Sequence, residues 1–176
     1  MSLKIRNFVY LMIFGILATM SSHMMWVIFQ WRLIPHLILI ISVAVVGENV
    51  VSSQGYYYYT RQETNGPFVR NMPLWIMFLW IFSVQSSFLI PIFLGFNDLV
   101  AVYISGCLAL LGDLILFEPY MSRKKELWRW TAVDRGYFEF IPPKLNRFTA
   151  PPGNYITWFA FPLLANSFLV LLMLIF

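Results

Sequence analysis

Five long apolar stretches occupy most of this chain and constrain its fold more than any other feature. Each stretch is about as long as the ~20 residues that a helix needs to cross the hydrocarbon core of a bilayer. They run roughly over residues 8–30, 33–51, 73–95, 99–117 and 155–176. We therefore predict an all-α, polytopic membrane bundle of about five transmembrane helices, in which residues 1–176 form a single integral membrane domain.

The composition argues against a soluble globular protein, because 60% of the residues are hydrophobic and only 11% are charged, with a mean hydropathy of +0.71. The loops 52–72 and 118–152 leave no room for a soluble catalytic module. The single cysteine, Cys107, lies in an apolar stretch, so neither a disulfide framework nor a thiol metal site is expected. His23 and His36 lack adjacent carboxylates, and we therefore predict no metal site and no cofactor.

The lysines and arginines gather in three segments that a five-span topology places on one side of the membrane. They are Lys4, Arg6, Arg61, Arg70, Arg123, Lys124, Lys125, Arg129, Arg135, Lys144 and Arg147. Only Arg32 lies on the opposite side. Since cytoplasmic loops carry an excess of positive residues, we predict a cell-membrane protein with a cytoplasmic N-terminus and an external C-terminus. The same distribution explains the net charge of +4 without a nucleic-acid partner.

The N-terminal basic residues before the first apolar stretch are similar to the start of a signal peptide. No small-residue cleavage site follows cleanly. We therefore expect the first stretch to be a retained helix.

Polar residues gather at the cytoplasmic ends of three predicted helices. Glu48 closes the second stretch, Asp113 and Glu118 lie at the end of the fourth, and Asn154 precedes the fifth. At a rise of about 1.5 Å per residue, all four lie within about 6 Å of the cytoplasmic boundary. The run of four tyrosines, residues 56–59, lies at the same level. This convergence predicts a pocket between the second, fourth and fifth helices.

The end of the fourth stretch combines small residues with an acid. Gly106, Ala109 and Asp113 share one helix face, which favours close helix packing and directs Asp113 toward the bundle interior. Pro119 is expected to end this helix. The following segment, residues 123–130, mixes basic residues with two tryptophans, which suits a short helix in the membrane interface.

A carboxylic acid in a water-poor pocket favours its neutral form and can act as a general acid. Aromatic faces around it could stabilise a developing carbocation. This combination suits protonation of a carbon–carbon double bond in an isoprenoid chain. Glu48 or Asp113 would then donate the proton while the other orients it or a water. The cavity and the substrate-binding groups would be provided by Tyr57, Tyr59, Glu118 and Asn154.

Each of these residues also has a purely structural interpretation. Glu48 and Glu118 could reach headgroup water or pair with Lys and Arg of the loops. Asp113 could make a structural hydrogen bond, and Asn154 could cap the fifth helix. The tyrosine run could form an interfacial aromatic belt, and the two tryptophans of segment 123–130 could anchor it in the membrane.

Short motifs follow one another in an informative order. The first group is Gly47-Glu48, Gly55, Tyr56 to Tyr59, Gly66-Pro67-Phe68, Met72-Pro73-Leu74 and Trp80. The second group is Asp113-Leu114, Glu118-Pro119, Trp128-x-Trp130, Pro151-Pro152, Asn154-Tyr155 and Trp158-Phe159. Over residues 44–162 this order resembles the carotenoid 1,2-hydratases, including the bisanhydrobacterioruberin hydratases. More distantly, the chain is similar to the small membrane lycopene and terpene cyclases.

The resemblance implies a membrane enzyme of carotenoid or related isoprenoid metabolism, a hydratase (a lyase) or a cyclase. Such an enzyme protonates a double bond and then adds water or closes a ring. The resemblance also adds Trp158 to the candidate substrate-binding residues. The expected partners are membrane lipid and an isoprenoid or carotenoid substrate.

Two other hypotheses remain open on sequence grounds. The chain could be a non-catalytic small subunit of a larger membrane complex, which would explain its brevity and its phenylalanine-rich faces. It would then bind membrane-protein partners or form a homo-oligomer. A transporter or proton relay could use the same carboxylates, but five spans without a repeated half argue against it.

Overall fold

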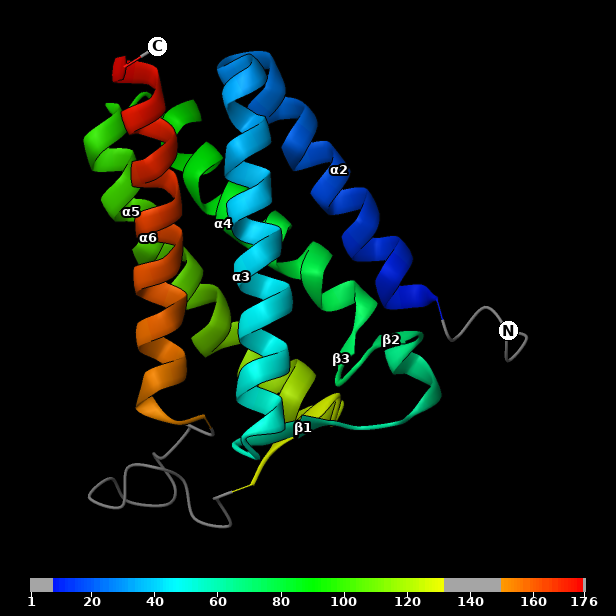
Figure 1. The fold of residues 1–176 in the computed structure, drawn as a ribbon. Coiled ribbons are helices and arrows are strands. Elements are labelled where there is room, and N and C mark those ends of the chain that lie inside the picture. Colours follow the sequence, from blue (N-terminus) through cyan, green and yellow to red (C-terminus); the bar gives the residue numbers. More distant parts are fainter. Residues whose placement is uncertain (1–7, 132–149, 176) are drawn as a thin grey trace.

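The computed structural model describes residues 8–131 and 150–175, and it is a bundle of long helices (Figure 1). The helices are α2 (Val9–Phe29), α3 (Leu33–Ser53), α4 (Leu74–Phe93), α5 (Asp98–Gly112), η3 (Asp113–Lys124) and α6 (Pro152–Ile175). A 3₁₀ turn, η1 (Gln30–Arg32), joins α2 to α3, and Figure 1 shows the two helices as arms that meet at this turn. The predicted helical fold is confirmed.

Four helical segments are long and apolar enough to cross a membrane when α2, η1 and α3 are counted together. These segments are Val9–Ser53, Leu74–Phe93, Asp98–Lys124 and Pro152–Ile175. The predicted apolar stretches therefore coincide with the long helices. Several basic residues that we used to predict orientation, namely Lys4, Arg6, Arg135, Lys144 and Arg147, lie outside the described residues.

The bundle exposes apolar side chains and buries polar ones, which is the pattern expected of helices that face lipid. Leu99 is 77% exposed and Leu174 is 76% exposed, whereas Gln85 and Asn166 are fully buried. Helix α4 lies at the centre, in contact with α2, α3, α5 and α6. Its large side chains, including Trp75, are part of the buried core together with residues of the other helices.

Helices α5 and α6 pack closely along the predicted stripe of small residues. A Cβ added at Gly106 would lie 2.7 Å from the carbonyl oxygen of Phe159 in α6, so only glycine permits this approach. Ala109 and Asp113 continue the same face and are both buried. The prediction that Asp113 points into the bundle is therefore confirmed.

The fourth apolar segment does not end at Pro119, so that prediction was wrong. The helix continues to Lys124 as the π-helix η3. In a π-helix each amide bonds to the fifth residue back, and Pro119, which has no N–H, leaves one such bond unmade. Residues five apart also lie over one another, whereas in an α-helix they would be about 140° apart. The π-helix thus brings Asp113 and Glu118 to the same face.

The segment that follows η3 forms a strand rather than the predicted interfacial helix. Strand β4 (Trp128–Trp130) pairs antiparallel with β1 (Tyr57–Tyr59), and Tyr58 lies opposite Arg129. In β4 the tryptophans alternate with Arg129, in β1 the three tyrosines alternate between buried and exposed, and strand pairing satisfies the backbone polar groups of both segments. We call this pair of strands the aromatic ribbon. A second small pair joins β2 (Phe68–Val69) to β3 (Met72–Pro73).

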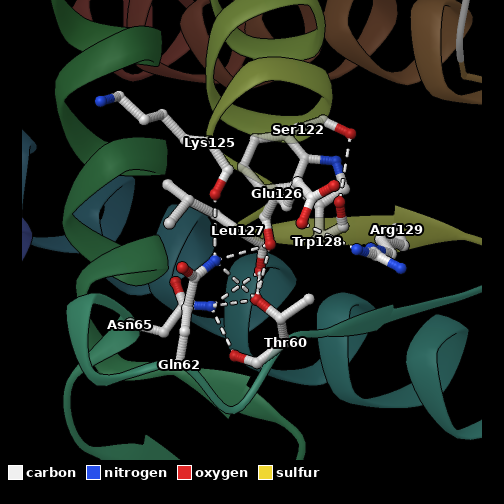
Figure 2. Close-up of polar contacts among 9 residues, drawn as sticks. All are labelled: Thr60, Gln62, Asn65, Ser122, Lys125, Glu126, Leu127, Trp128 and Arg129. Atoms are coloured by element: carbon white, nitrogen blue, oxygen red, sulfur yellow. Dashed lines mark hydrogen bonds and ion pairs between the residues drawn. The ribbon is translucent and has the colours of Figure 1, made fainter.

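Side chains near the turn η2 (Glu63–Asn65) fasten the two loops together beside the ribbon (Figure 2). Gln62 Nε2 donates to the backbone oxygens of Lys125 and Glu126, at 3.0 and 2.7 Å. Asn65 Nδ2 donates to the oxygen of Leu127 at 2.7 Å. These bonds hold segment 60–65 against segment 125–127, and so fix the edge of the ribbon.

Candidate functional site

A cavity of about 50 Å³ lies where the ribbon meets the helix ends. It is lined by Glu48, Tyr57, Tyr59, Ile76, Leu79, Trp80, Asp113, Glu118, Trp128, Trp130, Asn154 and Trp158. Every candidate site residue predicted from the sequence is in this set. The structure therefore brings together side chains from α3, α4, η3, α6 and both strands of the ribbon. We call this space the carboxylate chamber.

Glu48 is held by donors from two directions. The hydroxyls of Tyr57 and Tyr59 donate to its Oε2, the latter at 2.8 Å, and Trp80 Nε1 donates to Oε1 at 2.8 Å. An ionised carboxylate only accepts hydrogen bonds, and this set of donors therefore suits it. Glu48 therefore points into the pocket, where it accepts hydrogen bonds, rather than toward headgroup water or a basic side chain of the loops.

The two tyrosines that bind Glu48 remain neutral donors. Burial raises the pKa of the Tyr57 and Tyr59 hydroxyls, and the nearby negative charge of Glu48 raises the pKa of both further. The neighbouring Tyr56 and Tyr58 are 57% and 49% exposed. The tyrosine run therefore divides between a pocket wall and an exposed face, according to its alternation along the strand.

Asp113 has one paired oxygen and one unpaired oxygen. Its Oδ2 accepts a hydrogen bond of 2.7 Å from Asn154 Nδ2, while Oδ1 is buried without a hydrogen-bond partner among the described residues. The residue itself is only 1% exposed. Asn154 stands in the first turn of α6, but its side chain binds Asp113 across the bundle. An unpaired buried carboxyl oxygen is costly unless it carries a proton or meets a ligand.

Glu118 accepts hydrogen bonds from both indoles of β4. Trp128 Nε1 lies 3.1 Å from Oε1, and Trp130 Nε1 lies 3.1 Å from Oε2. Glu118 is 2% exposed, so these contacts are shielded from solvent. The tryptophans that we expected to anchor the chain in the membrane instead turn their polar edges into the chamber.

The remaining wall of the chamber is aromatic and apolar. The rings of Trp80 and Trp158 stack at 4.6 Å between centroids with an angle of 12°, and Phe117 lies 5.3 Å from Trp158. Ile76 and Leu79 of α4 complete the lining. Aromatic faces beside carboxyl groups are the environment expected to stabilise a transient cation.

Sequence reasoning did not select Trp80, Trp128 or Trp130 as site residues. Trp80 belonged to the ordered motifs, and the spacing Trp128-x-Trp130 matches a strand with both rings on one face. That spacing was the available signal for strand β4, though not for its pairing with β1. Among the described residues, no group of three or more His, Cys, Asp and Glu side chains could hold a metal ion.

Comparisons with protein-family models, with curated proteins and with solved structures gave no match. The function must therefore be argued from the chamber itself.

Proposed function

We propose that this protein is a membrane enzyme of carotenoid or isoprenoid metabolism that protonates a carbon–carbon double bond. Water addition or ring closure then follows. In this proposal α2, α3, α4, α5–η3 and α6 each cross the cell membrane, with the N-terminus and the ribbon on the cytoplasmic side. The asymmetry of lysines and arginines and the exposed apolar helix faces support that topology.

The observation that carries the proposal is the unequal pairing of the chamber's carboxyl groups. Glu48 accepts from three donors, and Glu118 accepts from two indoles. Asp113 accepts from Asn154 alone in the hydrogen bonds described above, and its Oδ1 is unpaired. A protonated Asp113 would direct its O–H from Oδ1 at the substrate. We therefore propose Asp113 as the proton donor.

The reaction would proceed without an external oxidant or reductant. Asp113 Oδ1 gives its proton to one carbon of the double bond, which leaves a cation on the other carbon. Trp80 and Trp158 face that cation. A water or a second double bond attacks it, and Glu48 receives the proton that is released. Transfer of this proton back to Asp113 restores the site.

The size of the cavity sets how the substrate binds. At about 50 Å³ it has room for a few waters, each of which needs roughly 10–15 Å³ by this measure. Ligand pockets for whole small molecules are typically about 300–1,000 Å³. We therefore propose that only the terminal double bond reaches the chamber, while the rest of the isoprenoid chain remains among the lipid tails.

The proposal is tested by Asp113→Asn in a host that makes acyclic carotenoids, with products identified by mass spectrometry. Loss of a general acid is expected to lower product formation by about 10²–10⁴-fold. Asp98→Asn is the matched control, because it makes the same change at the other end of the same helix. A mass gain of one water would indicate hydration, and an unchanged mass with a new retention time would indicate cyclisation.

If the variant is inserted in the membrane and still forms product at the original rate, the acid assignment is wrong. If the unmodified chain forms no product from acyclic carotenoids or shorter isoprenoids, the non-catalytic subunit becomes the better hypothesis. Gentle detergent extraction would then be expected to recover it in a stable complex.

A further inference from the structure

We infer that Glu118 is a positioning residue that fixes the aromatic ribbon as the closing wall of the chamber, and that it acts through Trp128 and Trp130. Any effect on turnover rests on the proposed function. The closure of the wall is independent of the proposed function, and it can be measured without a substrate.

The ribbon is built to turn one aromatic face inward. Its register places Tyr57 opposite Trp130 and Tyr59 opposite Trp128, with ring centroids 4.8 and 6.2 Å apart. All four side chains line the chamber. The alternate residue Tyr58 is about half exposed on the other face. The ribbon therefore separates the chamber from the surface with a layer one strand pair thick.

Each strand is bound by the carboxylate of the helix that precedes it in the chain. Glu48 of α3 accepts from Tyr57 and Tyr59 of β1. Glu118 of η3 accepts from Trp128 and Trp130 of β4. Ser122 of η3 also donates to the backbone oxygen of Trp128 at 3.3 Å, but Glu118 is the residue that binds the indole N–H groups of β4.

The ribbon needs such anchors because each strand has only three residues. An isolated two-stranded pair is marginally stable at best in water. The side-chain bonds of Gln62 and Asn65 hold one edge of the ribbon (Figure 2), but they contact backbone oxygens of residues 125–127, before the tryptophans. The indole rings contact Tyr57 and Tyr59, and their N–H groups are bound by Glu118.

A carboxylate is also the group that this role requires. Indole N–H groups only donate, and both carboxylate oxygens of Glu118 accept them. Oε1 lies 3.1 Å from Trp128 Nε1 and 3.2 Å from Trp130 Nε1, and Oε2 lies 3.1 Å from Trp130 Nε1. A glutamine offers one acceptor oxygen, and because Trp130 Nε1 contacts both oxygens of Glu118, the NH₂ group would face the Trp130 N–H in either orientation of the amide. Glu118→Gln is therefore expected to loosen Trp130 while keeping the side-chain volume.

The test uses a cysteine reporter inside the chamber. Leu79 lines the cavity and is only 2% exposed, so Leu79→Cys in a Cys107→Ser background reports access through the wall. The full chain in detergent is labelled with N-ethylmaleimide, and the rate is followed by mass spectrometry. Glu118→Gln should raise the labelling rate about tenfold, the factor expected for loss of one or two hydrogen bonds. An unchanged rate would overturn the inference.

Glu126→Gln is the matched control in the same segment. Glu126 makes an exposed ion pair with Arg129 at 2.7 Å, and its side chain lies outside the lining of the chamber. This variant should label at the rate of the reporter alone. Equal acceleration by both substitutions would mean that any change of charge loosens the segment, and the specific role of Glu118 would be rejected.

A double-mutant cycle with Trp130→Phe tests whether Glu118 acts through the indoles. Trp130→Phe keeps an aromatic ring but removes one donor, so it should also accelerate labelling. If Glu118 acts through Trp130, the double variant should label no faster than the faster single variant. Multiplication of the two rate increases would show independent roles and contradict the inference. Trp130→Phe alone carries the test if Glu118→Gln does not fold.

The outcomes for the two proposals are separable. Glu118→Gln could accelerate labelling of the reporter while Asp113→Asn keeps full activity. This result would reject Asp113 as the proton donor but retain the positioning role of Glu118. Conversely, Glu118→Gln could leave the labelling rate unchanged while Asp113→Asn is inactive. This result would reject the positioning role of Glu118 but retain Asp113 as the proton donor.

Discussion

Within the described residues, the carboxylate chamber can be compared with a second layer of buried polar side chains, which lacks its acids and its cavity. The second layer, which we call the amide layer, consists of Ser21, Ser22, His36, Gln85, Ser105 and Asn166. Asn166 contacts His36 Nε2 at 3.2 Å and donates to Ser105 Oγ at 3.1 Å. Ser105 precedes Asp113 by eight residues, which corresponds to about 12 Å along the helix.

The two layers differ in charge and in space. The amide layer joins groups that can all remain neutral. The carboxylate chamber adds three acidic side chains, an aromatic wall and a cavity of about 50 Å³. Neutral hydrogen bonds between helices stabilise and orient a membrane bundle. Buried acids beside empty space do this poorly, which is why the chamber is the better candidate for chemistry.

The largest effect on stability is expected from Glu48→Gln in the carboxylate chamber. This change replaces an acceptor of three hydrogen bonds with an amide that must turn its NH₂ group toward a donor. Hydrogen bonds to a charged group contribute about 1.5–3 kcal/mol, so a loss of about that size is expected in the free energy of unfolding. It should be measured by SDS titration of the refolded protein. Wild-type stability would show that the three donors do not depend on the carboxylate.

A smaller effect is expected from Asn166→Leu in the amide layer. The change leaves His36 Nε2 and Ser105 Oγ without the amide, and interhelical hydrogen bonds in membranes are worth about 0.6–2 kcal/mol. Stability should fall by about 1–2 kcal/mol, while product formation per folded molecule stays unchanged. A selective loss of product would remove the distinction between a structural layer and a functional one.

The smallest effect on stability near neutral pH is expected from the ionisation of Tyr57 and Tyr59, and this effect grows at high pH. Because their pKa is raised by burial and by Glu48, the folded protein retains protons that the unfolded chain releases above about pH 10. Their contribution to stability is therefore complete below about pH 10 and is lost as the pH rises further. Tyrosinate absorbance from these two residues should appear only together with unfolding. Complete ionisation of all tyrosines with the helices intact would contradict this expectation.

The helices and the position of the chamber could both be predicted from the lengths of the apolar stretches. Long apolar stretches specify the helices, and counting from their ends places Glu48, Asp113 and Asn154 at one level. The unequal pairing of Asp113 and Glu48 could not be predicted, because it depends on which oxygens find donors from distant segments.

The ribbon and the π-helix escaped prediction for physical reasons. β1 and β4 are separated by about 70 residues of sequence, and no local pattern encodes such pairing. Pro119 is an ordinary stop signal, but this bundle contains prolines inside helices, at Pro91 of α4, Pro119 of η3 and Pro162 of α6. The amide layer was missed because a single Asn166 or Gln85 in an apolar stretch does not indicate its partner.

Infrared spectroscopy of the purified protein at neutral pH tests the central claim most directly, because a protonated carboxyl group has its own carbonyl stretch. A buried carboxylic-acid band should be present in the wild type, absent in Asp113→Asn and retained in Glu48→Gln. A band that survives in Asp113→Asn and disappears in Glu48→Gln would contradict the assignment of Asp113 as the chamber's acid.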